Sequence, residues 1–232
     1  MFRFNRNDKW LNRLRQLRNY RINRLWLDEV KLDKSFKKEL YRKAIHLSSL
    51  WIPLMIYFAH TGVSVTLFTT LLLGDLILEY ANYRRIPWAR QIFAVLFSRT
   101  MRHKETTHAR FEASGSMYVL ASAIVCTILF SKHVAVISLT VMLISDTVAA
   151  LFGKAYGTRK LYKNKSLEGT CAFFVSALIV NIVCSTFYPF GVASVIACII
   201  ATFAEMFEDK LEIDDNFSIP LSVGICLTFL NL

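Results

Sequence analysis

The sequence has few of the residues that separate domains. Four prolines and eight glycines are spread over 232 residues, and no proline- or serine-rich linker interrupts the chain. Because such linkers mark domain boundaries, their absence favours a single folded domain. We therefore expect one domain over residues 39–232, preceded by a basic segment over residues 1–38.

Cysteine pairs and a cleavable leader are also missing. None of the five cysteines has metal-ligand spacing and no pair suggests a disulfide, which excludes a zinc module and a disulfide scaffold. All five fall inside apolar runs, where we expect them to be small packing residues. The first 40 residues are basic and polar without an apolar core, so we expect no cleavable signal peptide.

Long apolar runs are abundant instead. Hydrophobic residues make up 54% of the chain, and the mean hydropathy is +0.39, which soluble domains rarely reach. Seven runs have close to the about 17–25 residues that cross a bilayer as a helix. They lie at 44–60, 63–81, 114–131, 133–152, 169–187, 190–207 and 217–232. The sequence predicts an all-α polytopic membrane protein with about seven transmembrane helices.

Basic residues lie almost entirely on one set of connections. Residues 1–43 carry 14 lysines and arginines, 82–113 carry seven and 153–168 carry five. The alternate connections, near positions 61, 132 and 188, hold only Lys132. Cytoplasmic loops are enriched in lysine and arginine, so this asymmetry predicts an N-terminus inside and a C-terminus outside.

The segment 1–38 combines basic residues with regularly spaced apolar ones. Leucines and an isoleucine recur at roughly helical spacing, at Leu11, Leu14, Leu17, Ile22 and Leu25. This pattern predicts a basic amphipathic helix on the inner leaflet, with a solvated helical arm as the alternative. The net charge of +11 lies beside membrane helices, so we expect anionic lipids as its partners and no nucleic acid.

Several ionisable residues lie inside the apolar runs. Each costs about 2.5–3.5 kcal/mol to insert, which makes such residues functional candidates. They are Asp75, Glu79, Asp146 and Glu205, with His46 just inside the first run. In the predicted topology all of them lie toward cytoplasmic helix ends, and they therefore point to one membrane face.

The first two groups of polar residues each share a helix face. Glu39, Arg42 and His46 have the spacing i, i+3 and i+7, and Asp75 and Glu79 have the spacing i and i+4. Two carboxylates on one face repel unless a cation lies between them. The simpler interpretations are a local ion pair for the first group and an interhelical salt bridge for the second.

The third group is "SDTVAALFGKAYGTRKLYKNKSLEGT", residues 145–170. Asp146 shares a helix face with small residues, and a hard cation such as Mg2+ prefers carboxylate oxygens and bridges them to phosphates. Gly153 and Gly157 allow tight turns. Basic residues follow at Lys154, Arg159, Lys160, Lys163 and Lys165. Ser166, Glu168 and Gly169 open the next helix, whose N-terminus can bind an anion. The alternative is an ordinary basic loop with Asp146 as a packed polar residue.

The fourth group is "AEMFEDKLEIDDNFSIPL", an acidic inner connection opposite the basic ones. Its acidic residues are Glu205, Glu208, Asp209, Glu212, Asp214 and Asp215. They could complete a site for a metal–nucleotide complex, or they could simply be solvated. Glu105 lies in the remaining inner connection.

Together these groups resemble the polytopic CTP-dependent lipid kinases, that is, dolichol kinase, CTP-dependent diacylglycerol kinase and phytol kinase. The matching segments are "ELYRKAIH" at 39–46, "SDTVAALFGKAYGTRKLYKNKSLEGT" at 145–170 and "ATFAEMFEDKLEIDDNFSIPL" at 201–221. The likeness covers roughly residues 39–232. CDP-diacylglycerol synthases are more distant relatives, and the HGG…DR signature with which they close is absent from this chain.

The resemblance implies transfer of the γ-phosphate of CTP to the hydroxyl of a lipid alcohol, with Mg2+ or another divalent cation. It implies four sets of site residues. The predicted catalytic residues are Asp146, Lys165, Asp75, His46 and Glu105. The predicted nucleotide- and phosphate-binding residues are Gly153, Gly157, Arg159, Lys160, Lys165, Ser166, Glu168, Gly169 and Asn216. The predicted metal ligands are Asp146, Glu205, Asp214 and Asp215, and the lipid headgroup would meet Glu39, Arg42 and His46.

Two other functions remain as alternatives at this point. One is a phosphatidate cytidylyltransferase, and the other is a non-catalytic transporter or scaffold. The preference for CTP over ATP rests on the resemblance, and the residues leave open diacylglycerol, dolichol, another polyprenol or phytol as the acceptor. They also leave open a bacterial inner membrane or the endoplasmic reticulum, with the active site on the cytoplasmic side.

Overall fold

The computed structural model describes residues 36–89, 91–92, 113–163, 165–211 and 213–230. A first helix covers residues 36–48. The elements that follow are α2 (Trp51–Phe58), α3 (Thr61–Tyr83), α5 (Gly115–Leu129), α6 (Lys132–Tyr156), β1 (Lys160–Tyr162), β2 (Lys165–Ser166), α7 (Leu167–Val183), the short 3-10 helix η1 (Cys184–Thr186), α8 (Val192–Met206), α9 (Glu208–Leu211) and α10 (Asp215–Phe229). The expected segment over residues 1–38 lies almost wholly outside the described residues.

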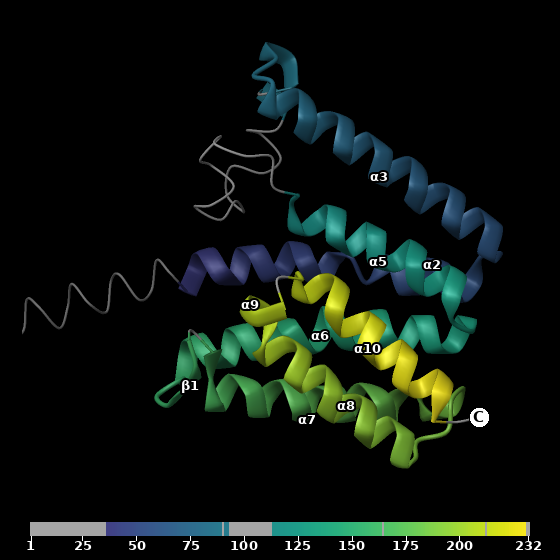
Figure 1. The fold of residues 1–232 in the computed structure, drawn as a ribbon, viewed down its shortest axis with the longest axis vertical. Coiled ribbons are helices and arrows are strands. Elements are labelled where there is room, and N and C mark those ends of the chain that lie inside the picture. Colours follow the sequence, from purple (N-terminus) through teal and green to yellow (C-terminus); the bar gives the residue numbers. More distant parts are fainter. Residues whose placement is uncertain (1–35, 90, 93–112, 164, 212, 231–232) are drawn as a thin grey trace, which may run out of the picture.

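Helix α6 forms the centre of the bundle. Figure 1 shows α7, α8 and α10 grouped with α6, α5 following, and α3 outermost. Of the most apolar 18 residues of each helix, 72% are buried in α6 but only 11% in α3. A helix that is apolar all round belongs in a core, as α6 does between Val134 and Leu143. Helix α3 exposes Leu71, Leu73 and Ile77, an apolar surface suited to lipid.

The helical character predicted from the sequence is confirmed, and the chain is a membrane protein. Among the described residues, three helices are long and apolar enough to cross a membrane, Thr61–Tyr83, Lys132–Tyr156 and Leu167–Thr186. Each of the seven predicted runs overlaps a described helix. However, α5, α8 and α10 have 15 residues each, about 22 Å at 1.5 Å per residue, which is shorter than a ~30 Å hydrocarbon core. The count of seven spans therefore stays a prediction.

The first predicted run, 44–60, is divided between two helices. The helix over 36–48 ends in a turn at residues 49–50, and α2 begins at Trp51. Pro53 explains the break, because proline has no N–H for the carbonyl four residues earlier and its ring clashes with that carbonyl. Proline is accepted in the first turn of a helix, which is where Pro53 lies in α2.

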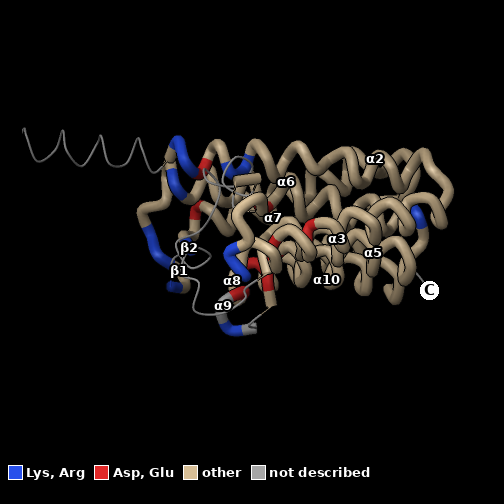
Figure 2. Tube along the Cα trace, turned by 90° about the horizontal axis from the view of Figure 1, so that it is seen from above, with Lys and Arg blue, Asp and Glu red and all other residues tan. Residues whose placement is uncertain are grey.

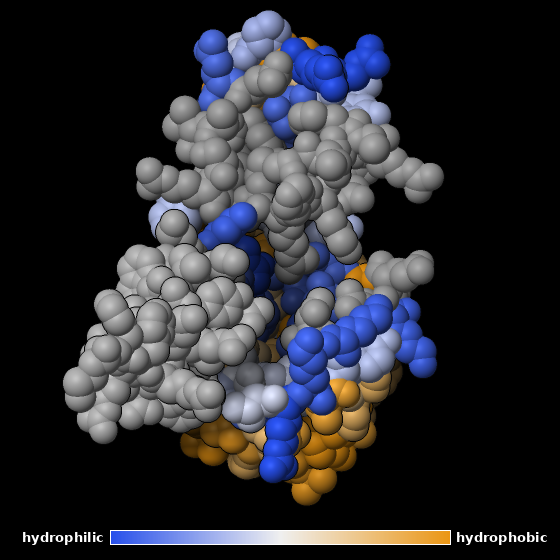
Figure 3. Space-filling model, turned by 90° about the vertical axis from the view of Figure 1, so that its left-hand side faces the viewer, coloured by the Kyte–Doolittle hydropathy of each residue, from blue (hydrophilic) through white to orange (hydrophobic). Residues whose placement is uncertain are grey.

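Charged residues gather at one end of the bundle. Figure 2 shows acidic and basic residues around β1, β2 and α9, and an isolated basic residue at the opposite end. Figure 3 looks onto the charged end, where hydrophilic residues lie above an apolar flank. At the opposite end Lys132 opens α6 and donates to the carbonyls of Tyr57 and Ala59, at 3.2 and 3.0 Å. The distribution agrees with one polar face meeting water and a long apolar body.

Glycines let α6 pack closely against α7 beside the hairpin that β1 and β2 form. A Cβ on Gly169 would lie 3.0 Å from the carbonyl oxygen of Ala149 and 3.1 Å from the Cα of Gly153. A Cβ on Gly157 would lie 2.1 Å from the carbonyl oxygen of Gly153. The three glycines that the sequence assigned to phosphate binding therefore have a steric role, and their phosphate contacts stay a prediction.

We expect Gly169→Ala to destabilise the protein, because the added methyl would force α6 and α7 apart. Overpacking of this kind costs about 1–3 kcal/mol, which should appear as a lower melting temperature in detergent. Gly74→Ala is the matched control, since a Cβ there meets nothing within 4 Å and alanine suits a helix interior better than glycine. Equal melting temperatures for the two variants would contradict the close packing.

Candidate active site

Asp146 forms a buried ion pair with Lys43. The Lys43 ammonium donates to Oδ2 of Asp146, and both residues are at most 5% exposed. His46 lies one turn after Lys43, with Nε2 3.5 Å from the same oxygen. Residues three apart share a helix face, so one face of the helix over 36–48 meets the predicted catalytic aspartate of α6.

Lys43 is missing from the residues predicted for the site. A lysine in a basic stretch before an apolar run is expected from the charge asymmetry of cytoplasmic segments alone. The available signal was its position in "KELYRKAIH", one turn from His46 and therefore on the same face. Removing one partner of a buried ion pair typically costs about 3–5 kcal/mol, so Lys43 is also important for the stability of this end.

Glu39 and Arg42 form a second pair beside the first. Arg42 donates to Oε1 of Glu39 at 2.5 Å, and Lys154 of α6 lies 3.7 Å from Oε2. Burial opposes ionisation of Glu39, but the hydrogen bond and charge of Arg42, with the charges of Lys43 and Lys154, hold its pKa below the ordinary value. Glu39 is therefore an anion that links the first helix to the end of α6.

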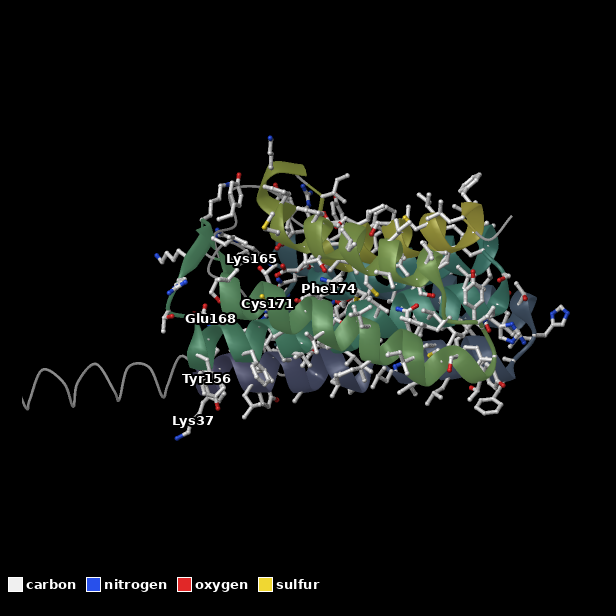
Figure 4. The ribbon with its side chains drawn as sticks, turned by 90° about the horizontal axis from the view of Figure 1, so that it is seen from below. Lys37, Tyr156, Lys165, Glu168, Cys171 and Phe174 are labelled. Atoms are coloured by element: carbon white, nitrogen blue, oxygen red, sulfur yellow. The ribbon has the colours of Figure 1, made fainter. Side chains whose placement is uncertain are left out.

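The hairpin directs Lys165 toward carboxylates of α8 and α9. β1 pairs antiparallel with β2, with Tyr162 opposite Lys165. The Lys165 ammonium lies 2.6 Å from Oε1 of Glu205 and 3.4 Å from Oε2 of Glu208. In Figure 4 Lys165 lies between the hairpin and the helices, whereas Lys37 projects outward. Burial alone would lower the pKa of Lys165, but Glu205, Asp215 and Glu208 raise it above the ordinary value.

The two ion-pair networks are close enough to interact. The charge of Lys165 acts on Asp146, and the charge of Asp215 acts on His46. The structure thus brings together residues from the first helix, α6, the hairpin, α8 and α10. Of the residues predicted from the sequence, this centre contains His46, Asp146, Lys165, Glu205 and Asp215.

Three carboxylates at the charged end could hold a metal ion. Glu208, Asp214 and Asp215 each place one oxygen within 4.8 Å of the others. Asp214 also accepts from the backbone N–H of Asn216 at 3.1 Å and so caps α10. Hard cations such as Mg2+ take carboxylate oxygens, so this donor set fits the expected cofactor. Glu208 was among the acidic residues noted but not among the predicted ligands.

Glu168 holds the base of the hairpin. Its Oε1 accepts from the backbone N–H of Thr158 at 3.1 Å, from the Thr158 hydroxyl at 2.5 Å and from the N–H of Arg159 at 3.3 Å. Ser166 caps α7 by accepting from the N–H of Gly169 at 3.1 Å. Arg159 and Lys160 are exposed on the hairpin. Contact of these residues with phosphate stays a prediction.

Asp75 and Glu79 join α3 to the start of α5. Oδ2 of Asp75 accepts from the Ser116 hydroxyl at 2.8 Å, and Oε2 of Glu79 accepts from the backbone N–H of Ser114 at 3.3 Å. The shared helix face predicted for the two carboxylates thus turns toward α5. Glu105 lies outside the described residues, so its predicted catalytic role has no structural context here.

Comparison with known proteins identifies the family of this chain. The cytidylyltransferase family matches residues 25–209. The chain belongs to that family. An uncharacterized protein of Rickettsia prowazekii is 31% identical over 84% of this chain and 96% of its own. The CTP-dependent diacylglycerol kinase 1 of Saccharomyces cerevisiae is 30% identical over 80% of this chain and 71% of its own.

A third relative comes from another yeast. The CTP-dependent diacylglycerol kinase 1 of Schizosaccharomyces pombe is 27% identical over 84% of this chain and 94% of its own. These relatives confirm the resemblance to CTP-dependent lipid kinases that the sequence motifs indicated. No solved structure matches the chain.

In this member of the cytidylyltransferase family, we expect Glu168→Ala to loosen the hairpin, because the backbone N–H groups of Thr158 and Arg159 lose their acceptor. Hydrogen exchange at these two amides should quicken by at least about tenfold, as expected for loss of a hydrogen bond of about 1.5–3 kcal/mol to a charged group. Glu168→Gln retains an acceptor oxygen and should quicken exchange less. Unchanged exchange in Glu168→Ala would show that the carboxylate does not hold the hairpin.

Proposed function

We propose that the protein is a CTP-dependent lipid kinase that transfers the γ-phosphate of CTP to the hydroxyl of diacylglycerol. The observation that carries the proposal is the paired network of Lys43 with Asp146 and of Lys165 with Glu205 at one end of an apolar bundle. Phosphoryl transfer depends mainly on positioning and on neutralising charge, which such a network can provide. The names of the yeast relatives support CTP as donor and diacylglycerol as acceptor.

The phosphate chain would lie between the hairpin and the first helix. Lys165 supplies a positive charge, and Lys43 supplies a second one from the opposite side. The N-terminus of α7 adds a favourable dipole for an anion, while its N–H groups at Leu167 and Gly169 donate to the Arg159 carbonyl and the Ser166 hydroxyl. Arg159 and Lys160 are exposed beside it and would attract the triphosphate from solution.

A divalent cation would be held by Glu208, Asp214 and Asp215, and it would neutralise negative charge on the phosphates when bound. Asp146 and Glu205 lie beside this donor set and can add carboxylate oxygens once their lysine partners move to phosphate. Asn216 follows directly and can contact the nucleotide. The structure gives these groups positions from four elements, α6, α8, α9 and α10, so the site needs the whole bundle to form.

The lipid alcohol would approach along the first helix. Glu39, Arg42 and His46 lie on that helix at the charged end, where a lipid hydroxyl at the membrane surface meets a water-soluble nucleotide. Helix α3 presents an apolar surface along which the acyl chains can lie. The basic residues of this end support a position on the cytoplasmic side of the membrane, by the positive-inside rule. Among Asp75, Glu105 and His46, we favour His46 to accept the hydroxyl proton because it contacts Asp146.

Nucleotidyl transfer to phosphatidate is the second candidate, and the family description favours it. It uses the same nucleotide and the same acidic centre. The two reactions differ in their products, because a kinase forms a phosphorylated lipid and CDP, whereas a cytidylyltransferase forms a CDP-lipid and pyrophosphate. The missing HGG…DR signature favours the kinase.

We expect purified protein in detergent with Mg2+ to move label from γ-labelled CTP into diacylglycerol. Asp146→Asn should lower the rate by at least about 100-fold, since removing one preorganised charged group from a site of this kind costs about 10²–10³. Lys132→Met, at the opposite end of the bundle, is the control and should keep its activity. ATP is tested in parallel as the alternative donor. A polyprenol and phytol are tested as alternative acceptors.

Three results would change the assignment. If transfer to a polyprenol or to phytol is faster, that alcohol would replace diacylglycerol as the proposed acceptor. A CDP-lipid formed only when phosphatidate is supplied would favour the cytidylyltransferase. If well-folded protein forms neither product from any substrate, a transporter or scaffold would be the remaining assignment.

A further inference from the structure

Lys165 occupies the position of a cation among carboxylates. Its ammonium lies within ion-pair distance of both Glu205 and Glu208, at 2.6 and 3.4 Å. It also interacts with the charge of Asp215. Glu208 and Asp215 belong to the group of three carboxylates that can converge on one ion. A lysine that pairs with Glu208 of this group and with the neighbouring Glu205 is doing what a bound cation would do there.

The charges at this centre are otherwise poorly balanced. Glu205 is 4% exposed and Asp215 is 4% exposed, so water screens them little. Like charges that share a site disfavour one another unless a cation intervenes. The Lys165 ammonium contacts both Glu205 and Glu208. Its charge therefore stabilises the carboxylates while no other cation is present.

Two buried oxygens beside this centre lack a hydrogen-bond donor among the described residues. They are Oε2 of Glu205 and Oδ1 of Asn216. A buried acceptor without a partner is costly, and the two side chains flank the carboxylate group from α8 and α10. Both oxygens are suitable ligands for a hard cation. They are acceptor positions that the single ammonium of Lys165 does not fill.

We infer that Lys165 is an internal counter-cation that exchanges with the divalent ion, so that the metal binds tightly only when the phosphates of the nucleotide take over the lysine. The inference rests on the proposed function, because the triphosphate is what accepts the lysine. Metal and ammonium compete for the same carboxylates, whereas metal and nucleotide each favour the other. Such coupling is reciprocal by thermodynamic linkage.

Because of this exchange, free metal and nucleotide-bound metal reach the site on different terms. Metal that arrives alone must displace an ammonium that the chain tethers beside these carboxylates. Metal that arrives with a triphosphate brings the replacement partner for Lys165. The arrangement therefore selects the metal–nucleotide complex over the free ion.

The test is the affinity of the full chain in detergent for Mn2+ without nucleotide, measured from the electron paramagnetic resonance signal of free Mn2+. Lys165→Met keeps the length of the side chain but removes the charge, and we expect it to bind Mn2+ at least tenfold more tightly than the wild type. Lys165→Arg keeps the charge and should stay near the wild type. Lys163→Met is the matched control, because it removes a lysine from the same hairpin, exposed on its surface.

An unchanged or weaker Mn2+ affinity in folded Lys165→Met would overturn the exchange, as would the absence of Mn2+ binding up to millimolar concentration in both proteins. The wild type supplies a second measurement that needs no variant. At a fixed free Mn2+ concentration, β,γ-methylene-CTP should raise its Mn2+ affinity at least tenfold, and no change would also overturn the inference. Tighter Mn2+ binding by Lys165→Met, together with no phosphoryl transfer by the wild type, would discard the kinase and leave the exchange intact.

Discussion

Charges at the edge of an apolar bundle must be paired, and this requirement organises the protein around the contact between Lys43 and Asp146. Neither residue has access to enough water to be solvated alone. An ionised carboxylate left unpaired in such a position is strongly unfavourable. The pair therefore fixes the first helix against α6 at one depth and one rotation. His46 and Glu39 lie on that same helix, so their positions follow from the pair.

The position of the hairpin also depends on paired charges, here those of Lys165 and Glu205. Its two strands are too short to be stable alone, and its position is set by side chains at both ends. Glu168 holds the backbone at Thr158 and Arg159, while the Tyr162 ring contacts the Phe207 ring at a centroid distance of 5.3 Å. Lys165, between these contacts, is consequently held against Glu205. Glycines at 153, 157 and 169 let α6 and α7 come close enough for the hairpin to reach α8.

Much of this arrangement could be predicted from the sequence, because apolar runs and buried charges carry strong signals. The runs matched described helices, and the cost of burying ionisable groups identified Asp146 and Glu205 as unusual. Lys43 was not predicted as a site residue, because a lysine beside a membrane segment is common. Its burial depends on a contact with a residue 103 positions away, which periodicity does not reveal. The break at Pro53 and the steric role of the glycines likewise depend on local packing.

The pairing of two central carboxylates, Asp146 and Glu205, with lysines also bears on how a membrane-edge site can exist without substrates. A cluster of acids prepared for a metal would repel itself, and a cluster of lysines prepared for phosphate would do the same. Setting Lys43 on Asp146 and Lys165 on Glu205 neutralises these two carboxylates at a depth where net charge is costly. The substrates then exchange partners with groups that are already in place, so less reorganisation is needed than if the charges had to be brought in from solvent. One set of ion pairs can thus support both the fold of the empty protein and the chemistry proposed for it.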